Sequence, residues 1–196
     1  MRILIAGLLI SSTFCFGQIR FEQKTDRVIV RINGSDFTEM RFGKSEHKPY
    51  LYPLRTASGK IITRGFPEDP KPGEDETGYH QRGTWIGHEL VSGVYYFEVD
   101  PQGYKGRPTG TLVFQDLTAA VGGDHEGVVA LVDDWVHPNG SVILHEKRAY
   151  KFYDDPKDSR TVDVEFRLTA KQKIELTDHK DCVLGLRLAM GFEERY

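Results

Sequence analysis

Hydrophobic and polar residues alternate along several stretches of this sequence, and this period of two constrains the fold more than any other feature. Between residues 161 and 169, valine, phenylalanine and leucine occupy every second position, with mostly charged residues between them. Side chains of a strand point alternately to its two faces, so the stretch predicts a half-buried antiparallel strand. No stretch shows a convincing 3.6-residue repeat of the kind that indicates an amphipathic helix.

Six further stretches have the composition of strands. They comprise residues 27–32, 37–42, 49–54, 110–121, 127–136 and 141–153. The last two are joined by a segment that ends in Asn-Gly, a dipeptide that readily adopts positive φ and favours a hairpin. A succession of long strands joined by short turns predicts an all-β fold, an antiparallel β-sandwich, in one domain over residues 18–196.

The N-terminus has the features of a secretory signal peptide. Arg2 precedes an apolar run that is shorter than the roughly 20 residues of a membrane span. Cys15 and Gly17 are small enough to flank a cleavage site, so residues 1–17 are predicted to be removed on export to the periplasm or the medium. A lipoprotein signal modified at Cys15 is one alternative, which Phe14 disfavours because a small residue should precede a lipidated cysteine. A buried first element is the other.

The charge distribution argues against nucleic acid as a partner. The chain carries 26 Lys and Arg residues against 29 Asp and Glu residues, and the two signs are interleaved rather than gathered in a basic stripe. After the signal peptide, no apolar stretch reaches transmembrane length. The mature protein is therefore expected to be soluble, and the sequence indicates no particular cofactor.

A polar cluster follows a stretch that predicts a long irregular loop. Residues 66–83 are rich in proline, glycine and acids, and long ordered loops are frequent binding or catalytic sites; a disordered linker is the alternative. His80, Arg82, Trp85 and His88 lie at and beyond its end. Imidazoles transfer protons, an indole stacks on a sugar ring, and a guanidinium binds hydroxyls or an anion. The cluster therefore predicts a site for a sugar or a carboxylate, with ordinary packing of Trp85 as the structural alternative.

The spacing of the two histidines argues against a shared metal ion. In an unbroken strand His80 and His88 would face the same side but lie about 26 Å apart, at about 3.3 Å per residue. Only a bend at Gly83 or Gly87 would bring them together. No metal ligands are assigned.

Charged residues also interrupt the apolar faces of two neighbouring strands. Glu146 and Arg148 alternate with apolar residues on one strand, and Asp134 falls in an alternating set of valines and alanine on the other. An inward charge is costly unless it is paired or exposed in a cleft. Asp134, Glu146 and Arg148 are therefore predicted to form either a buried ion network or the wall of a pocket open to solvent.

Several short motifs carry a family resemblance. They are the segment 48–56, Gly59, Thr63 with Arg64, the spaced set His80, Arg82, Gly83, Trp85, Gly87 and His88, and the pairs Asp134 with Trp135, Glu146 with Arg148 and Gly185 with Arg187. Together they resemble the bacterial PmoA-like family over about residues 27–191. The resemblance implies an exported protein associated with carbohydrate use, and by fold-level analogy a sandwich similar to the galactose-mutarotase-like supersandwich.

The sequence departs from that family in two places. The family segment Asp-His-Pro-His-His-Arg-Gly-Leu-Trp corresponds here to residues 77–85, in which two of the three histidines and the acid are replaced. Family members also continue beyond the strand that holds Gly185 and Arg187. The sandwich is therefore expected to be incomplete at its C-terminal end, in a truncated product or a shorter paralogue.

These residues lead to three functional hypotheses. The first is a carbohydrate-active or carbohydrate-binding protein; as an enzyme it would use His80 or His88 as the acid or base and Arg82 to orient the substrate. The residues expected to contact the substrate are Trp85, Asp134, Glu146 and Arg148, with Asp134 or Glu146 as the partner carboxylate. The second is a non-catalytic structural or binding module. The third and least favoured is a metal-dependent oxygenase.

Overall fold

The computed structural model describes residues 18–97, 106–155, 158–179 and 182–192. The predicted signal peptide lies outside these residues. The strands are β1 (Ile19–Gln23), β2 (Arg27–Ile32), β3 (Ser35–Arg41), β4 (Tyr50–Leu51), β5 (Thr84–His88), β6 (Leu90–Val91), β7 (Val94–Tyr95), β8 (Thr111–Val121), β9 (Glu126–Val136), β10 (Val142–Tyr153), β11 (Val162–Ala170) and β12 (Cys182–Leu186), followed by a single 3-10 turn, η1 (Met190–Phe192).

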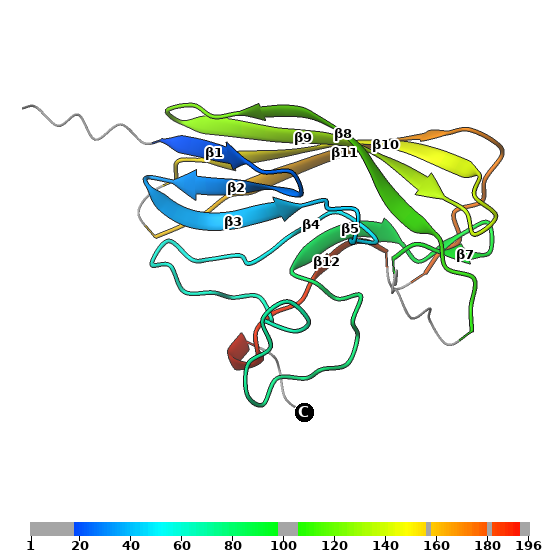
Figure 1. The fold of residues 1–196 in the computed structure, drawn as a ribbon, viewed down its shortest axis with the longest axis horizontal. Helices are drawn as coiled ribbons and strands as arrows, with labels where there is room; N and C mark the ends of the chain where they lie inside the picture. The colour runs from blue at the N-terminus through cyan, green and yellow to red at the C-terminus, as the bar shows by residue number, and fades with distance from the viewer. Residues whose placement is uncertain (1–17, 98–105, 156–157, 180–181, 193–196) are drawn as a thin grey trace, which may run out of the picture.

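Two antiparallel sheets pack face to face as a β-sandwich, which confirms the predicted fold class. One sheet has six strands in the order β1-β2-β3-β4-β5-β12, and the other has four in the order β11-β10-β9-β8. Figure 1 shows them as two layers, with the long connection from β4 to β5 hanging below the six-stranded sheet. The pair β6 and β7 forms a small separate sheet. Among the described residues, none forms a helix long and apolar enough to cross a membrane.

The long strands form where alternation predicts them. The bounds of β8, β9, β10 and β11 each differ from the predicted ones by at most one residue, and β2 matches its prediction. The Asn-Gly segment closes the hairpin between β9 and β10, with Gly140 at φ 88°. The strand predicted at 49–54 is reduced to the two residues of β4, and β1, β5, β6 and β7 were not predicted.

The core consists of the inward side chains of both sheets. In β2, Val28, Val30 and Ile32 are fully buried, while the residues between them are only partly buried. A larger cluster joins β1, β2 and β3 to β9 and β10, and a smaller one around Trp135 and Tyr96 fills the other end. Burial of these alternating side chains supplies the main stabilising free energy of the fold.

The sandwich is open at the β12 edge of the six-stranded sheet. Within the described residues β12 pairs only with β5, so it ends the sheet. Leu184 and Leu186 lie opposite Ile86 and Thr84 in this pairing, yet Leu184 is 55% exposed and Leu186 is 49% exposed. Leucine side chains, which are usually buried in a core, are therefore exposed to solvent at this edge.

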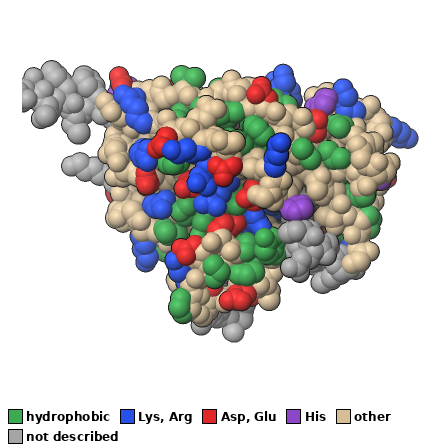
Figure 2. Space-filling model, viewed as in Figure 1, with side chains coloured by type: hydrophobic (Ala, Val, Ile, Leu, Met, Phe, Trp, Pro, Cys, Tyr) green, Lys and Arg blue, Asp and Glu red, His purple; other side chains and the backbone are tan. Residues whose placement is uncertain are grey.

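The outer face of β1–β3 carries interleaved charges. Arg31 lies 2.8 Å from both Glu22 and Asp36, and Arg41 pairs with Glu39 at 2.8 Å. Figure 2 shows basic and acidic side chains mixed over this face. Such exposed pairs are individually weak and serve mainly to keep the face hydrated.

Candidate functional site

A buried ion network lies between the two sheets. Arg148 donates from Nε to Glu146 Oε1, and the indole Nε1 of Trp135 donates to Glu146 Oε2 at 2.7 Å. Both charged side chains are inaccessible to solvent. Of the two predicted alternatives for Glu146 and Arg148, the structure therefore has the buried network and not an open pocket wall.

The acid that completes this network is Asp133, not Asp134. Asp133 is fully buried, with Oδ2 3.7 Å from Nη2 of Arg148, and neither carboxylate oxygen has a hydrogen-bond partner among the described residues. Burial raises the pKa of Asp133 to about 7. Asp134 points to the opposite face of β9 and contacts Nδ1 of His145 there, so the prediction that it joins Glu146 is wrong.

The long loop before β5 is tied down by a buried arginine. Arg64 is 1% exposed, and its guanidinium donates four hydrogen bonds of 2.8–3.2 Å to the backbone carbonyls of Asp75, Thr77, Gly78 and Gln81. A guanidinium presents a rigid fork of donors, which suits it to hold several carbonyls at once. The loop is thus an ordered part of the fold, unlike the disordered linker that the sequence left open.

The carboxylate of Glu74 fixes the first half of the same loop. It accepts hydrogen bonds from the backbone N–H groups of Gly65, Phe66 and Lys71, at 2.9, 3.1 and 3.0 Å. Bonds from backbone N–H groups to a carboxylate are stronger than neutral ones. Together with Arg64, this side chain fixes the path of the loop through contacts within the loop itself.

Arg82 is the centre of a half-buried polar cluster under this loop, which we call the Arg82 cluster. Its guanidinium pairs with Glu46, lies 3.4 Å from Oε1 of Glu68, and stacks over the ring of Tyr79 at 4.3 Å. Tyr50 donates its hydroxyl to Glu68 at 2.9 Å. Burial raises the pKa of Glu68, although Arg82 opposes the rise. One guanidinium thus orients two carboxylates and two phenol rings.

A cavity of about 470 Å³ adjoins this cluster, and Glu46 belongs to both. We call it the Phe42 cavity. The rings of Phe42 and Phe114 are stacked beside it, with centroids 4.3 Å apart. The polar residues that line it are Lys44, Glu46, His47, Thr111 and Gln115. An apolar floor with a few convergent polar groups is the usual composition of a small-molecule site, and its volume falls within the range of about 300–1,000 Å³.

Trp85 lies on the outer face of β5 and is a packing residue. It is 3% exposed, contacts Phe97 with ring centroids 5.2 Å apart, and has the ammonium of Lys48 4.6 Å above its own ring. Gly185 on β12 leaves room for it, because a Cβ there would lie 2.3 Å from Cζ2 of the indole. Its six-membered ring is therefore covered by protein, as the structural alternative expected.

The two predicted histidines belong to different elements. His80 is buried within the loop. His88 ends β5, which runs unbroken from Thr84, so its Cα lies about 13 Å from that of Thr84 at about 3.3 Å per residue. Burial lowers the pKa of His88, and neighbouring His179 lowers it further. His88 and Trp85 also face opposite sides of the strand, since they are an odd number of residues apart.

The predicted site residues are thus distributed over six places, with His80 inside the long loop and Trp85 packed on the outer face of β5. Arg82 lies in the Arg82 cluster next to the Phe42 cavity, His88 ends β5, Glu146 and Arg148 are in the core, and Asp134 is on the far face of the four-stranded sheet. In the ranges that the structure describes, no group of three or more His, Cys, Asp and Glu side chains is arranged to hold a metal ion.

Sequence reasoning missed the partners of Arg82. Glu46 and Glu68 come from segments without regular secondary structure, where no periodicity assigns a direction to a side chain. Tyr50 was part of the family motif, but nothing in its neighbours indicated an acid as partner. Alternation gave no signal here either, because Leu51 is buried together with Lys48, Tyr50 and Tyr52.

Fold and site together define a β-sandwich protein with a cavity beside an arginine–carboxylate cluster. The model of DUF6807, described as a family of unknown function, matches residues 27–196, and the chain belongs to this family. No curated protein and no solved structure gives a significant match to the chain. None of the comparisons links it to the PmoA-like family or to galactose mutarotases.

Proposed function

We propose that this protein is an exported carbohydrate-binding protein whose ligand occupies the Phe42 cavity. The observation that carries the proposal is the composition of the cavity wall: a stacked aromatic pair together with the carboxylate of Glu46, the amide of Gln115 and the ammonium of Lys44. Sugars offer apolar C–H faces and many hydroxyls, so they are bound by aromatic surface combined with carboxylate and amide groups.

The Arg82 cluster supports this role by holding Glu46 in place. A hydroxyl-binding carboxylate must keep a fixed orientation, and preorganisation reduces the entropy lost on binding. Arg82 occupies one oxygen of Glu46, and Arg82 is in turn held by Glu68 and the ring of Tyr79. The second oxygen of Glu46 is then available to accept a sugar hydroxyl.

The acid–base residues predicted from the sequence, in contrast, lie outside the Phe42 cavity. A general base must lie within hydrogen-bond reach of the proton that it removes. His88 is at the far end of β5 from Arg82, and Glu146 is sealed in the core by Arg148 and Trp135. The export part of the proposal is supported by the composition of residues 1–17.

The proposal is tested by titrating the isotope-labelled protein with glucose, galactose, cellobiose and lactose and following backbone amide resonances. At least one sugar should shift the resonances of segments 42–47 and 111–115, which line the cavity. Glu46→Gln should weaken binding by about tenfold or more, because a hydrogen bond to a charged acceptor is lost.

Glu39→Gln is the matched control. Glu39 also pairs with an arginine, Arg41, but does not line the cavity. It should leave the affinity unchanged, and melting temperatures of both variants would show that the fold is intact. If no sugar shifts the cavity resonances, or if Glu39→Gln weakens binding as much as Glu46→Gln, the proposal is wrong.

A further inference from the structure

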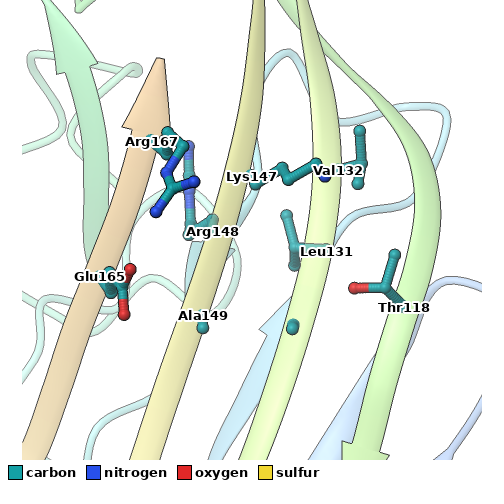
Figure 3. Close-up of a pocket in the computed structure, with 9 residues that line it drawn as sticks. Thr118, Leu131, Val132, Lys147, Arg148, Ala149, Glu165 and Arg167 are labelled. Carbon is teal, nitrogen blue, oxygen red and sulfur yellow. The ribbon is translucent and has the colours of Figure 1, made fainter. Parts of the chain in front are cut away.

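A hollow of about 370 Å³ lies on the outer face of the four-stranded sheet, on the far side of the ion network. Its floor is formed by the small apolar residues Ala130, Val132 and Ala149, and its wall carries the polar side chains of Thr118, Lys147, Glu165 and Arg167. Figure 3 shows Arg167 and Glu165 on β11 at one side, Thr118 on β8 at the other, and Lys147 extending toward Val132. We call it the cationic hollow.

Two cations stand directly opposite each other in this hollow. Lys147 of β10 is the register partner of Arg167 of β11, and both side chains are exposed on the same face. Directly opposed residues have Cβ atoms about 4.5–5.5 Å apart, where like charges destabilise a sheet. A sequence selected only for stability would place an acid at one of the two positions.

Neither cation is neutralised by a neighbour. Across the described ranges, no ion pair within 4.0 Å involves Lys147 or Arg167, whereas Lys151, four residues further along the same face of β10, pairs with Glu126 at 2.7 Å. Glu165 lies opposite Ala149, two residues from Arg167 along β11, and forms no ion pair with either cation. Of the other acids near the hollow, Asp134 is engaged by His145, and Asp116, opposite Val132 on β8, has no ion pair with either cation among the described residues. Positive charge therefore remains unbalanced at one end of the hollow.

The rest of the wall selects the kind of anion. Glu165 repels a ligand that carries negative charge along its whole length, but its carboxylate accepts hydrogen bonds from hydroxyls. The hydroxyl of Thr118 faces it across the apolar floor, where it can donate or accept. A ligand with one carboxylate at one end and hydroxyls at the other matches this polarity.

We propose that the cationic hollow is a binding site for a sugar acid, with the carboxylate held by Lys147 and Arg167 and the hydroxyls by Glu165 and Thr118. The floor of Ala130, Val132 and Ala149 accommodates the apolar face of the ring. This site is independent of the Phe42 cavity, since no residue lines both. Failure of one proposal therefore leaves the other standing.

The experiment compares galacturonate, galactose and acetate as probes of the full mature chain by amide-resonance titration at low ionic strength. Galacturonate should shift the resonances of residues 130–132, 147–149 and 165–167. Galactose and acetate should bind about tenfold more weakly or worse, because each lacks one half of the recognised groups. Equal affinity for acetate and galacturonate would overturn the sugar-acid assignment.

Variants on one strand face provide the control. Lys147→Gln and Arg167→Gln should each weaken galacturonate binding by about tenfold, because a charge-assisted hydrogen bond is lost. Lys151→Gln removes the same charge from the same face of β10 outside the hollow and should change the affinity less than twofold. If Lys151→Gln and Lys147→Gln lose the same amount of affinity for galacturonate, the ligand is attracted by general surface charge and the proposed site is refuted. Binding that persists in the double variant Lys147→Gln/Arg167→Gln would refute it as well.

Discussion

Replacing Asp133 with asparagine should stabilise the protein at high pH and have little effect at low pH. Asp133 is fully buried between the sheets, and both of its carboxylate oxygens lack hydrogen-bond partners among the described residues. Burial raises its pKa from 3.8 to about 7. The folded protein therefore keeps a proton that the unfolded chain releases between those pH values, and stability falls as pH rises across that window.

The size of the effect follows from the shift in pKa. A rise of about three units corresponds to about 4 kcal/mol at 1.36 kcal/mol per unit, reached in full above about pH 7. Below pH 3.8 the carboxyl is protonated in both states, and the contribution disappears. Asparagine is neutral throughout and of nearly the same shape, so Asp133→Asn should gain up to about 4 kcal/mol at pH 8 and close to nothing at pH 4.

Urea unfolding curves at pH 4, 6 and 8, followed by tryptophan fluorescence, would measure the difference. Glu146→Gln is the informative comparison, because it removes the carboxylate that binds both Arg148 and Trp135. It should destabilise the protein at pH 6 and 8 by about 3–5 kcal/mol, the cost of breaking a buried ion pair from one side. A free-energy difference between Asp133→Asn and the native protein that stays constant from pH 4 to pH 8 would refute the reasoning.

Three further predictions concern other parts of the fold. Gly185→Ala should lower the free energy of unfolding by about 1–3 kcal/mol in urea titrations, because its Cβ would collide with the ring of Trp85; an unchanged midpoint would contradict this. Lys147→Glu should raise stability by about 0.2–1 kcal/mol by facing Arg167 with an opposite charge, and a decrease would argue against the assigned register. Arg64→Ala should lower the melting temperature and speed proteolytic cleavage within residues 75–81, since four carbonyls lose their donor; equal cleavage rates would mean that the loop is held by other contacts.

The positions of the long strands β8–β11 were predictable from the sequence, but the inward face of β9 was not. Both alternating sets of β9 are largely apolar, and each includes one aspartate, so alternation alone does not decide between Asp133 and Asp134. The structure buries the set that contains Leu131 and Trp135, whose side chains are the larger ones, and leaves Ala130 in the half-exposed set. The volume of the side chains was therefore the signal that distinguishes the inward face of β9 from the outward one.

The candidate site was predictable only in part. Arg82 was identified from its neighbours in sequence, but Glu46 and Glu68 reach it from segments without a repeating pattern. Trp85 and His88 were grouped with Arg82 because they are close along the chain, whereas strand alternation turns them to opposite faces. When two irregular segments meet only in the folded structure, no local pattern in a single sequence indicates that they are close.

The pairing of β5 with β12 affects the order in which the chain can fold. His88 is paired with Cys182, and the amide of Arg187 donates to the carbonyl of Gly83 at 2.9 Å, so residues almost a hundred positions apart complete one sheet. Such distant contacts form slowly, because much of the chain must be ordered before they stabilise it. Until β12 has been synthesised, one edge of β5 stays unpaired, and an unpaired strand edge is open to chaperones and to misassembly.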